Sequence, residues 1–327
     1  MIDLKEIIQY IKTHAYHYKT TKSLYNIIVG AKTHQTYFDA CSQQLLSLYH
    51  SHPNLKYPSF ERIFNSLNES GDNLNINLKI TPRYTFESIQ QTFQVIQLLI
   101  QTISYNNHHT LSFIPVSQIN KVQHRVKRIF HKIKQEQKEK LFEEEIYLLF
   151  KRINKENDNS ILHYFLQGFE ETMYTNQQVG MIESLTDDDL LRIKMNDFVE
   201  MMSQLENKDD FPILNKAIIL PVLSQNAYQT YQHVKEGLKM KQIAHLENVK
   251  ENTVEDHILE LFIKGYLSDY NKYLNEVFYS NFKPFYQNQK ESRLKAFKAE
   301  FPINSYFEIK LAIIRIARGD RDAARSP

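Results

Sequence analysis

Glycine, cysteine and tryptophan are scarce in this sequence of 327 residues, which has seven glycines, one cysteine and no tryptophan. At the usual share of about 7%, a chain of this length would hold roughly 23 glycines. Nucleotide-binding α/β sheets need glycine-rich turns against phosphate, and all-β sandwiches need turn residues at short intervals, so neither class fits. The single cysteine, Cys41, excludes an intrachain disulfide and is typical of a reducing cytoplasm.

Long hydrophobic runs are also absent from the sequence. The longest candidate, Val95 to Ile103, is interrupted by Gln97, Gln101 and Thr102 and falls short of the ~18 apolar residues that a membrane span needs. The first residues, MIDLKEIIQYIK, carry charges where a secretory signal would have an apolar core. We therefore expect a soluble cytoplasmic protein.

Neither sign of charge dominates the whole chain, because 40 Lys and Arg stand against 38 Asp and Glu. The resulting net charge of +2 gives the whole molecule no general attraction to nucleic acid or membrane. This total conceals a pattern, since residues 136–211 carry a net charge of −10 and residues 283–318 a net charge of +5. A third segment, residues 121–134, has six Lys and Arg and no acid. Any attraction to a polyanion must therefore be local.

Helical periodicity runs through most of the chain. Val122, Val126 and Ile129, for example, recur at the spacing of one helix face. One segment breaks the pattern: from Asn73 to Tyr84 apolar and polar residues alternate, which predicts a half-buried strand. Helices followed by such a strand favour a small winged-helix-like module.

The predicted fold class is mostly α, in three units and a tail. We expect a winged-helix-like module over residues 1–85, a helical middle domain over 86–212, a helix-turn-helix domain over 213–318 and a flexible tail over 319–327. The boundary near residue 212 rests on the polar run that ends in Phe211-Pro212. No internal repeat indicates a solenoid.

The segment from Tyr228 to Tyr266 has the spacing of a helix-turn-helix. Its first helix is expected to end at Gly237 and its third at Gly265, because glycine readily adopts the left-handed conformation that follows a helix end. A small residue in the second helix lets the second and third helices approach closely. The residues expected in their shared core are Ile243, Ala244, Val249, Val254 and Ile258.

The first exposed positions of the third helix are those that would enter the major groove in a DNA-reading protein. They are Lys250, Glu251, Asn252, Glu255 and Asp256. Three of these five carry carboxylates, which oppose the neutralisation of phosphates that supplies most DNA affinity. Asn252 can still pair with adenine, so base reading stays open. We treat these residues as a candidate partner or DNA face and favour a structural or protein-binding use.

Two parts of the chain resemble known families. The matching motifs include Ile243-Ala244, Thr253-Val254 and the late run Ser305-Tyr306-Phe307-Glu308. Because of these motifs, residues 237–266 and 293–317 resemble the helicase-type helix-turn-helix domain found near the C-terminus of some RecQ-type DNA helicases. Residues 23–40, SLYNIIVGAKTHQTYFDA, resemble the start of the YpbB family of Gram-positive bacteria. In that family both parts occur in one chain, and the gene usually lies beside a RecQ-like helicase gene.

The chain departs from the family pattern at two positions. Gly30-Ala31-Lys32-Thr33 stands where the family usually has Gly-Lys-Arg-Thr. Lys250 replaces the usual small polar residue before the third helix of the helix-turn-helix. The second change removes an N-cap acceptor, typically worth ~1 kcal/mol, so the start of that helix is expected to be less sharply defined.

The basic segment 121–134 is the main candidate for contact with phosphate. Its apolar stripe faces a core and leaves its bases on the remaining surface, and contacts of such bases with phosphate weaken steeply with salt. The alternative is a solvated helix neutralised by the acidic residues from Glu136 onward. The candidate phosphate contacts are Lys32, Lys121, Arg125, Lys127, Arg128 and Lys132.

The sequence offers no recognisable catalytic, metal-binding or cofactor-binding constellation. The Gly-Ala-Lys-Thr run lacks the first glycine of a phosphate loop, whose position is taken by Tyr25. The thirteen histidines come without a cysteine pair or a His-Glu-x-x-His run. Three aspartates after Thr186 predict a capped helix start rather than a metal site. We therefore expect no enzyme, no cofactor and no metal.

Two functions are compatible with these sequence features. The family resemblance implies a non-catalytic accessory protein that binds a RecQ-like DNA helicase, with DNA as a further candidate partner, in DNA repair or recombination. The alternative is a helix-turn-helix transcriptional regulator that binds duplex DNA. That alternative expects a basic reading helix, against which the acidic residues of the third helix argue.

Overall fold

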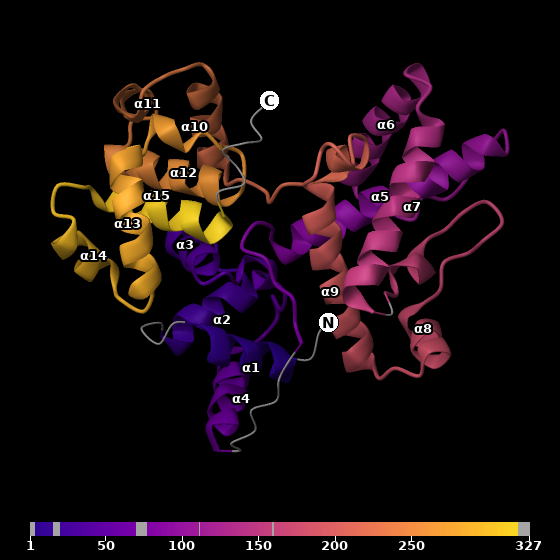
Figure 1. The fold of residues 1–327 in the computed structure, drawn as a ribbon, viewed down its shortest axis with the longest axis horizontal. Helices are drawn as coiled ribbons and strands as arrows, with labels where there is room; N and C mark the ends of the chain where they lie inside the picture. The colour runs from indigo at the N-terminus through magenta and orange to yellow at the C-terminus, as the bar shows by residue number, and fades with distance from the viewer. Residues whose placement is uncertain (1–3, 16–19, 70–76, 111, 159, 320–327) are drawn as a thin grey trace. The chain divides into compact units, whose positions relative to one another are not determined.

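A computed structural model describes residues 4–15, 20–69, 77–110, 112–158 and 160–319. Over these ranges all regular secondary structure is helical, which confirms the mostly α class (Figure 1).

The described helices fall into two halves of the chain. The first half contains α1 (Leu4–His14), α2 (Thr21–Val29), α3 (His34–Ser42), the 3₁₀ helix η1 (Leu46–Leu48), α4 (Tyr57–Glu69), α5 (Phe86–Asn107), α6 (Asn120–Gln135) and α7 (Glu139–Asn157). The second half contains η2 (Leu162–Phe165), α8 (Asn176–Glu183), α9 (Asp187–Leu205), η3 (Leu214–Ala217), α10 (Gln225–Lys235), α11 (Met240–Leu246), α12 (Glu251–Ile263), η4 (Tyr270–Lys272), α13 (Glu276–Asn288), α14 (Leu294–Glu300) and α15 (Tyr306–Arg318).

Contacts group the chain into two compact units. Unit 1 consists of residues 1–7, 74–79 and 87–219, and unit 2 of residues 8–73, 80–86 and 220–327. The division into three units stays a prediction. What the sequence did not indicate is that the N-terminal helices and the C-terminal helix-turn-helix share one unit, in which α3 packs against both α12 and α15.

Unit 1 is built around the packed pair α7 and α9, with α6 against α7 and α8 against α9. Leu149 and Ile153 of α7 are fully buried. The buried carboxylate of Glu145 accepts hydrogen bonds from the backbone nitrogens of Ile213 (3.0 Å) and Leu214 (2.8 Å). Burial raises the pKa of Glu145, and these N–H donors partly offset that rise by stabilising the charged form. The carboxylate thereby fixes η3 against α7.

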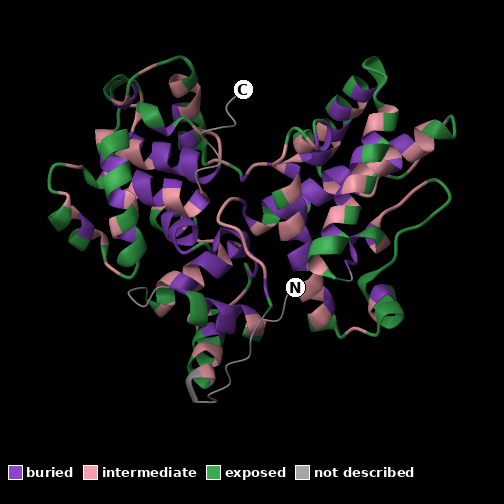
Figure 2. Cartoon of the chain, in the orientation of Figure 1, coloured by how far each residue is buried: buried purple, intermediate pink, exposed green. Residues whose placement is uncertain are grey.

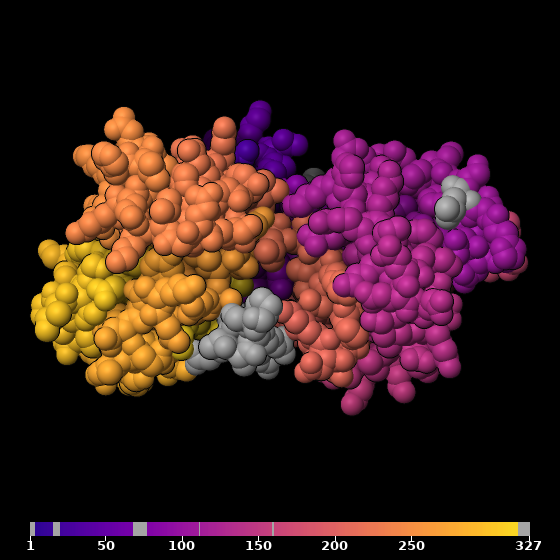
Figure 3. Space-filling view, turned by 90° about the horizontal axis from the view of Figure 1, so that it is seen from above, coloured from indigo at the N-terminus to yellow at the C-terminus, as the bar shows by residue number. Residues whose placement is uncertain are grey.

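Unit 2 is organised around α12, which contacts α3, α10, α11 and α15. Most of α12 is buried, and its exposed residues are confined to its first turns (Figure 2). Residues 220–319 present one continuous surface in the space-filling view, in orange to yellow (Figure 3). Aromatic rings fill the space between α13 and α14, where Phe282 lies 5.6 Å from Phe297 and 5.4 Å from Phe301, measured between ring centroids.

Several helix ends occur where the sequence predicts them. Thr186 caps α9 by accepting a hydrogen bond from the backbone nitrogen of Asp189. Gly237 and Gly265 have φ angles of 83° and 78°, in the left-handed region. Lys250 makes no side-chain cap at the start of α12, as its replacement of a small polar residue predicts.

The predicted strand is wrong for the described part of its segment, since residues 77–84 contain no strand. The backbone nitrogen of Lys79 donates instead to the side chain of Asn196 (2.7 Å), and that of Thr81 donates to Ser47 (3.0 Å). Side-chain acceptors thus replace the neighbouring strand that a sheet would require. The rest of the segment lies outside the described residues, and no strand of a winged-helix module is seen within them.

The predicted tail lies outside the described residues except for Gly319, which follows the last helix. Among the helices that the structure describes, none combines the length and the apolar character needed to cross a membrane.

Candidate functional site

Helices α10, α11 and α12 form the helix-turn-helix of unit 2. Gly237 ends α10 in a left-handed conformation. The turn between α11 and α12 passes through Asn248, whose φ is 52°, and the backbone nitrogen of Val249 donates to the carbonyl of Ala244 at 3.0 Å. This bond ends α11 and sets the direction in which α12 begins.

The helix-turn-helix core matches the sequence prediction except at one position. Ile243, Ala244, Val254 and Ile258 are buried. Val249 is 36% exposed, so its assignment to the core is wrong. It follows the left-handed Asn248, which turns the chain outward, and neighbouring Leu246 is 60% exposed. The turn therefore presents two apolar side chains to solvent.

The first turns of α12 form a negatively charged face. Lys250 and Asn252 are exposed, and Glu251, Glu255 and Asp256 are half-buried. Burial raises the pKa of Glu255, and the neighbouring carboxylates of Glu251 and Asp256 raise it further. A carboxylate held among like charges favours a cationic ligand and disfavours phosphate. We call Glu251, Asn252 and Glu255, with Leu246 and Val249, the turn face.

One carboxylate of this region is already paired inside unit 2. The ammonium of Lys310 lies 3.7 Å from Asp256 Oδ1 and 5.7 Å from the ring centroid of Phe38 on α3. Asp256 therefore contributes to the contact of α12 with α15, and it is less available to a ligand than Glu251 or Glu255.

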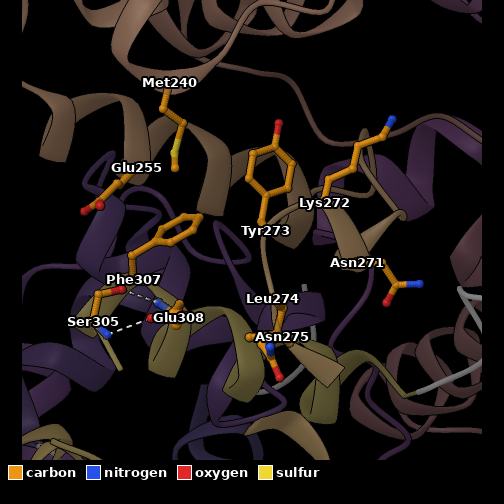
Figure 4. Close-up of a pocket in the computed structure, with 10 residues that line it drawn as sticks. All are labelled: Met240, Glu255, Asn271, Lys272, Tyr273, Leu274, Asn275, Ser305, Phe307 and Glu308. Carbon is orange, nitrogen blue, oxygen red and sulfur yellow. Dashed lines mark hydrogen bonds between the residues drawn. The ribbon is translucent and has the colours of Figure 1, made fainter. Parts of the chain in front are cut away.

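A hollow of about 390 Å³ opens beside the turn face (Figure 4). Its lining includes Met240 of α11, Glu255 of α12, Tyr273, and Phe307 and Glu308 of α15. The carboxylate of Glu308 already accepts a hydrogen bond from the backbone nitrogen of Ser305 at 2.8 Å, which caps α15. The lining also contains Lys272, while the rings of Tyr273 and Phe307 and the carboxylate of Glu255 suit the side chain of a lysine or arginine.

The inner end of α12 holds a buried ion pair. Lys264 Nζ lies 2.7 Å from Glu260 Oε1, and both side chains are 1% exposed. The ammonium also donates to the carbonyl of Val222 (2.7 Å) and lies 3.8 Å from the ring centroid of Tyr37. Burial alone would raise the pKa of Glu260, but Lys264 and the backbone N–H of Ser224 outweigh it and hold that pKa below its usual value.

Two histidines lie near this ion pair, His34 at the start of α3 and His257 on α12 itself. His34 Nδ1 lies 3.4 Å from Glu260 Oε2, and its ring centroid lies 5.6 Å from that of His257. The ring of His257 is buried, with Nδ1 2.8 Å from the hydroxyl of Thr230. Burial and the nearby His34 lower the pKa of His257, against the opposing effect of the carboxylates of Glu247, Glu260 and Asp256.

Sequence reasoning missed Glu260, Lys264 and His257. The available signal was the i, i+4 spacing of Glu260 and Lys264 inside an otherwise apolar run, because charges in such a run must be paired when the helix is buried. Nothing in the sequence indicated that α3, about 200 residues earlier, supplies the third partner.

Acid is expected to destabilise unit 2 through His257. Its lowered pKa means that the unfolded chain binds more protons than the folded one as the pH falls below about 6.5, so folding stability falls with it. The midpoint of thermal unfolding should therefore drop between pH 7.5 and pH 5.5, and His257→Gln should reduce that drop. His245→Gln, at an exposed position of α11, is the matched control. An equal drop in both variants would contradict the assignment.

The bases of residues 121–134 lie on α6 in unit 1. The apolar stripe of Val122, Val126, Ile129 and Ile133 is buried, as predicted. Two lysines are neutralised by acids that follow: Lys132 lies 3.4 Å from Glu136 and Lys134 lies 2.7 Å from Glu139. This part of α6 agrees with the alternative of an internally neutralised helix.

The middle of α6 is different. Arg125 donates a hydrogen bond to the carbonyl of Lys216 at 3.3 Å. Burial lowers the pKa of Lys121, and the negative charge of Glu87 partly opposes that change. Lys127 and Arg128 are exposed, and no acid in the described part of the chain pairs with either. With the exposed His124 and His131 they line the face of α6 opposite the buried stripe.

Lys32 lies in unit 2, exposed between α2 and α3. Gly30 ends α2 with a φ of 76°, and Thr33 caps α3 by accepting a hydrogen bond from the backbone nitrogen of Thr36. The Gly-Ala-Lys-Thr run is thus a turn and a helix start.

Metal ligands do not gather in the part of the chain that the structure describes, where no three His, Cys, Asp or Glu side chains could together hold an ion.

Comparisons with known proteins agree with the helix-turn-helix. Residues 226–313 match a family described as a helix-turn-helix domain. The chain is also similar to the protein YpbB of Bacillus subtilis (strain 168), with 24% identity over 228 residues. That match covers 67% of this chain and 64% of the relative, so this chain corresponds to somewhat less than two thirds of that protein. No solved structure matches. A relationship to YpbB-like proteins is supported, and the C-terminal part of the chain contains a helix-turn-helix domain.

Proposed function

We propose that this protein is a non-catalytic, cytoplasmic accessory factor that binds a RecQ-like DNA helicase through the turn face and DNA through α6, in DNA repair or recombination. The proposal that the turn face binds a protein rests on the negative charge of the first turns of α12. Glu251 and Glu255 occupy positions at which a DNA-reading helix would usually carry lysine or arginine. The choice of a RecQ-like helicase rests on two resemblances: that of residues 23–40 to the start of the YpbB family, and that of residues 237–266 and 293–317 to the helicase-type helix-turn-helix domain.

The turn face has the composition of a protein-binding surface. Leu246 and Val249 expose apolar area, and the carboxylates around them attract cationic side chains while repelling phosphate. The hollow beside Glu255 offers an aromatic-walled position for one such side chain (Figure 4). A partner with basic residues beside apolar ones fits this surface.

Binding to the cognate RecQ-like helicase is the direct test. The two purified proteins should form a complex at micromolar concentrations in gel filtration, and Glu251→Lys with Glu255→Lys should raise the dissociation constant at least about tenfold, or ~1.4 kcal/mol. Glu143→Lys with Glu144→Lys, at exposed positions of α7, makes the same change of charge elsewhere and should leave binding unchanged. Absence of a complex with the unaltered protein would overturn the proposal.

Enzymatic activity is tested on the isolated protein. We expect no hydrolysis of nucleoside triphosphates above background, because the Gly-Ala-Lys-Thr run is a helix start without the spacing of a phosphate loop.

The alternative function is a transcriptional regulator that reads duplex DNA through α12. One observation favours it: Asn252 is exposed on the first turn of α12, where its amide can reach a base edge. Sequence-selective duplex binding that is lost in Asn252→Ala would support the regulator over the accessory factor.

A further inference from the structure

An apolar surface lies exposed on unit 1, far along the chain from the helix-turn-helix. It is formed by α8 and the long loop that leads to it from α7 (Figure 1). Met181 and Ile182 of α8 are 70% and 52% exposed, and Phe169, Met173 and Tyr174 of the loop are each more than two fifths exposed. The ring of Phe169 is stacked on that of His108 at the end of α5, with centroids 4.2 Å apart, and is left out of the surface defined here. We call Met173, Tyr174, Met181 and Ile182 the α8 surface. Four large apolar side chains exposed within ten residues exceed the scattered single exposures that are usual on a protein.

The α8 surface is held in place by its own hydrogen bonds. Val179 is fully buried and anchors α8, which packs against α9. Thr175 and Gln178 form a capping box at the start of α8. The backbone nitrogen of Tyr174 donates to the carbonyl of Tyr164 at 2.9 Å, and their rings meet edge to face. The apolar side chains are therefore presented by an ordered segment and do not belong to an unsupported loop.

The charge around the α8 surface has one sign. Residues 165–191 contain six acids and no lysine or arginine. Glu170, Glu171, Asp187 and Asp188 are exposed, and none of them forms an ion pair with a base in the described part of the chain. The next bases along the chain are both used: Arg192 pairs with Glu6 and Asp189, and Lys194 lies 3.6 Å from the ring centroid of Phe165.

Lys194 lies against the start of α8 and is half-buried. Burial lowers its pKa to about 8, because the ammonium is removed from water. Its amino group donates to the side chain of Asn176, the first residue of α8, at 3.3 Å. Lys194 is still mostly protonated at pH 7, but residues 165–194 hold six acids against only Arg192 and Lys194, which leaves a net charge of −4.

These observations exclude two kinds of ligand and favour one. Phosphates of DNA and anionic lipid headgroups would be repelled by the carboxylates. A cationic segment with an apolar face matches both properties of the surface, and exposed methionines adapt well to the side chains of such a helix. We propose that the α8 surface binds a basic amphipathic helix of a partner protein. This contact is separate from the turn face and does not depend on the helicase.

The proposal is tested with a peptide probe. A fluorescein-labelled peptide of 18 residues, with leucines at i, i+3, i+4 spacing and lysines elsewhere, should bind the full chain with a micromolar dissociation constant measured by fluorescence anisotropy. A peptide of the same composition in scrambled order, which has no apolar face, should bind at least about tenfold more weakly.

Two pairs of substitutions locate the contact. Met181→Lys with Ile182→Lys should raise the dissociation constant at least about tenfold, because it removes apolar area and adds like charge. Val277→Lys with Ile303→Lys, at exposed apolar positions of unit 2, is the matched control and should stay within about twofold of the unaltered protein. All four positions are exposed, so folding is expected to be retained, and circular dichroism checks it.

Three results would overturn the proposal. The first is equal loss of peptide binding in both pairs of variants, and the second is equal binding of the ordered and scrambled peptides. The third is concentration-dependent self-association that Met181→Lys with Ile182→Lys abolishes, because the occupant of the surface would then be a second copy of this chain.

Discussion

Replacement of Lys264 by methionine is expected to lower the free energy of unfolding of unit 2 by about 3–5 kcal/mol, the usual cost of leaving one partner of a buried ion pair without its counterion. Methionine preserves the length of the side chain, so the loss arises mainly from charge. Glu260 would remain buried with only the hydrogen bonds of Ser224 and the more distant His34. The carbonyl of Val222 would also lose its donor.

The double variant Glu260→Leu with Lys264→Met separates charge from packing. Because it removes both buried charges, it should be more stable than Lys264→Met alone, despite losing the bonds of Glu260 to Ser224. Lys272→Met is the matched control, since Lys272 pairs with Asp269 at the surface, and it should cost less than about 1 kcal/mol. Urea unfolding followed by circular dichroism is the measurement, because the chain has no tryptophan to report by fluorescence. A double variant less stable than the single one would contradict this account.

The same ion pair has a pH signature. The folded-state pKa of Glu260 is below its usual value, so the pair stabilises unit 2 fully above the unfolded pKa of about 4.3. That contribution is lost as the pH falls through the folded-state pKa. It lies at lower pH than the loss expected from His257, and the two effects are therefore separable in a pH series.

The second large effect is expected in DNA binding. If α6 contacts phosphates, Lys127→Glu with Arg128→Glu should weaken binding to a labelled duplex at least about tenfold at 50 mM salt. It should also lower the magnitude of the slope of log affinity against log salt by about 2, since each phosphate contact that forms releases ~0.9 counterion from the DNA and two such contacts are lost. Neither side chain has an acidic partner in the described part of the chain, so the substitution breaks no ion pair there.

A control at the helix-turn-helix makes this test decisive. Lys241→Glu with Lys250→Glu changes the net charge by the same amount, at exposed positions around α11 and α12. The accessory-factor proposal expects this pair to have the smaller effect. A larger loss at the helix-turn-helix than at α6 would favour the transcriptional regulator.

Helix ends and buried stripes were predictable from the sequence because each depends on residues close together in the chain. Thr186 caps the helix that follows it, Gly237 ends the helix before it, and Val126 is buried with its neighbours one turn away. The helix-turn-helix core was predicted at four of five positions for the same reason. Val249 was not, since the sequence does not show that Asn248 adopts a left-handed conformation.

The contacts that join distant segments were not predictable from one sequence. Alternation from residue 73 to 84 is the pattern of a strand, yet over residues 77–84 the backbone is satisfied by the side chains of Asn196 and Ser47 instead. The pairing of His34 with Glu260 likewise depends on where α3 packs. Local periodicity carries no information about either partner.

The shared unit formed by α3, α12 and α15 sets an order of events during synthesis. Roughly 200 residues separate α3 from α12, so at about 5–20 residues per second the ribosome needs some 10–40 s to make the partner of α3. During that interval residues 87–219, which belong to unit 1, are already available to fold. Until then α3 can pack only against its early neighbours α2 and η1, so the part of its surface that α12 and α15 cover is exposed on the nascent chain.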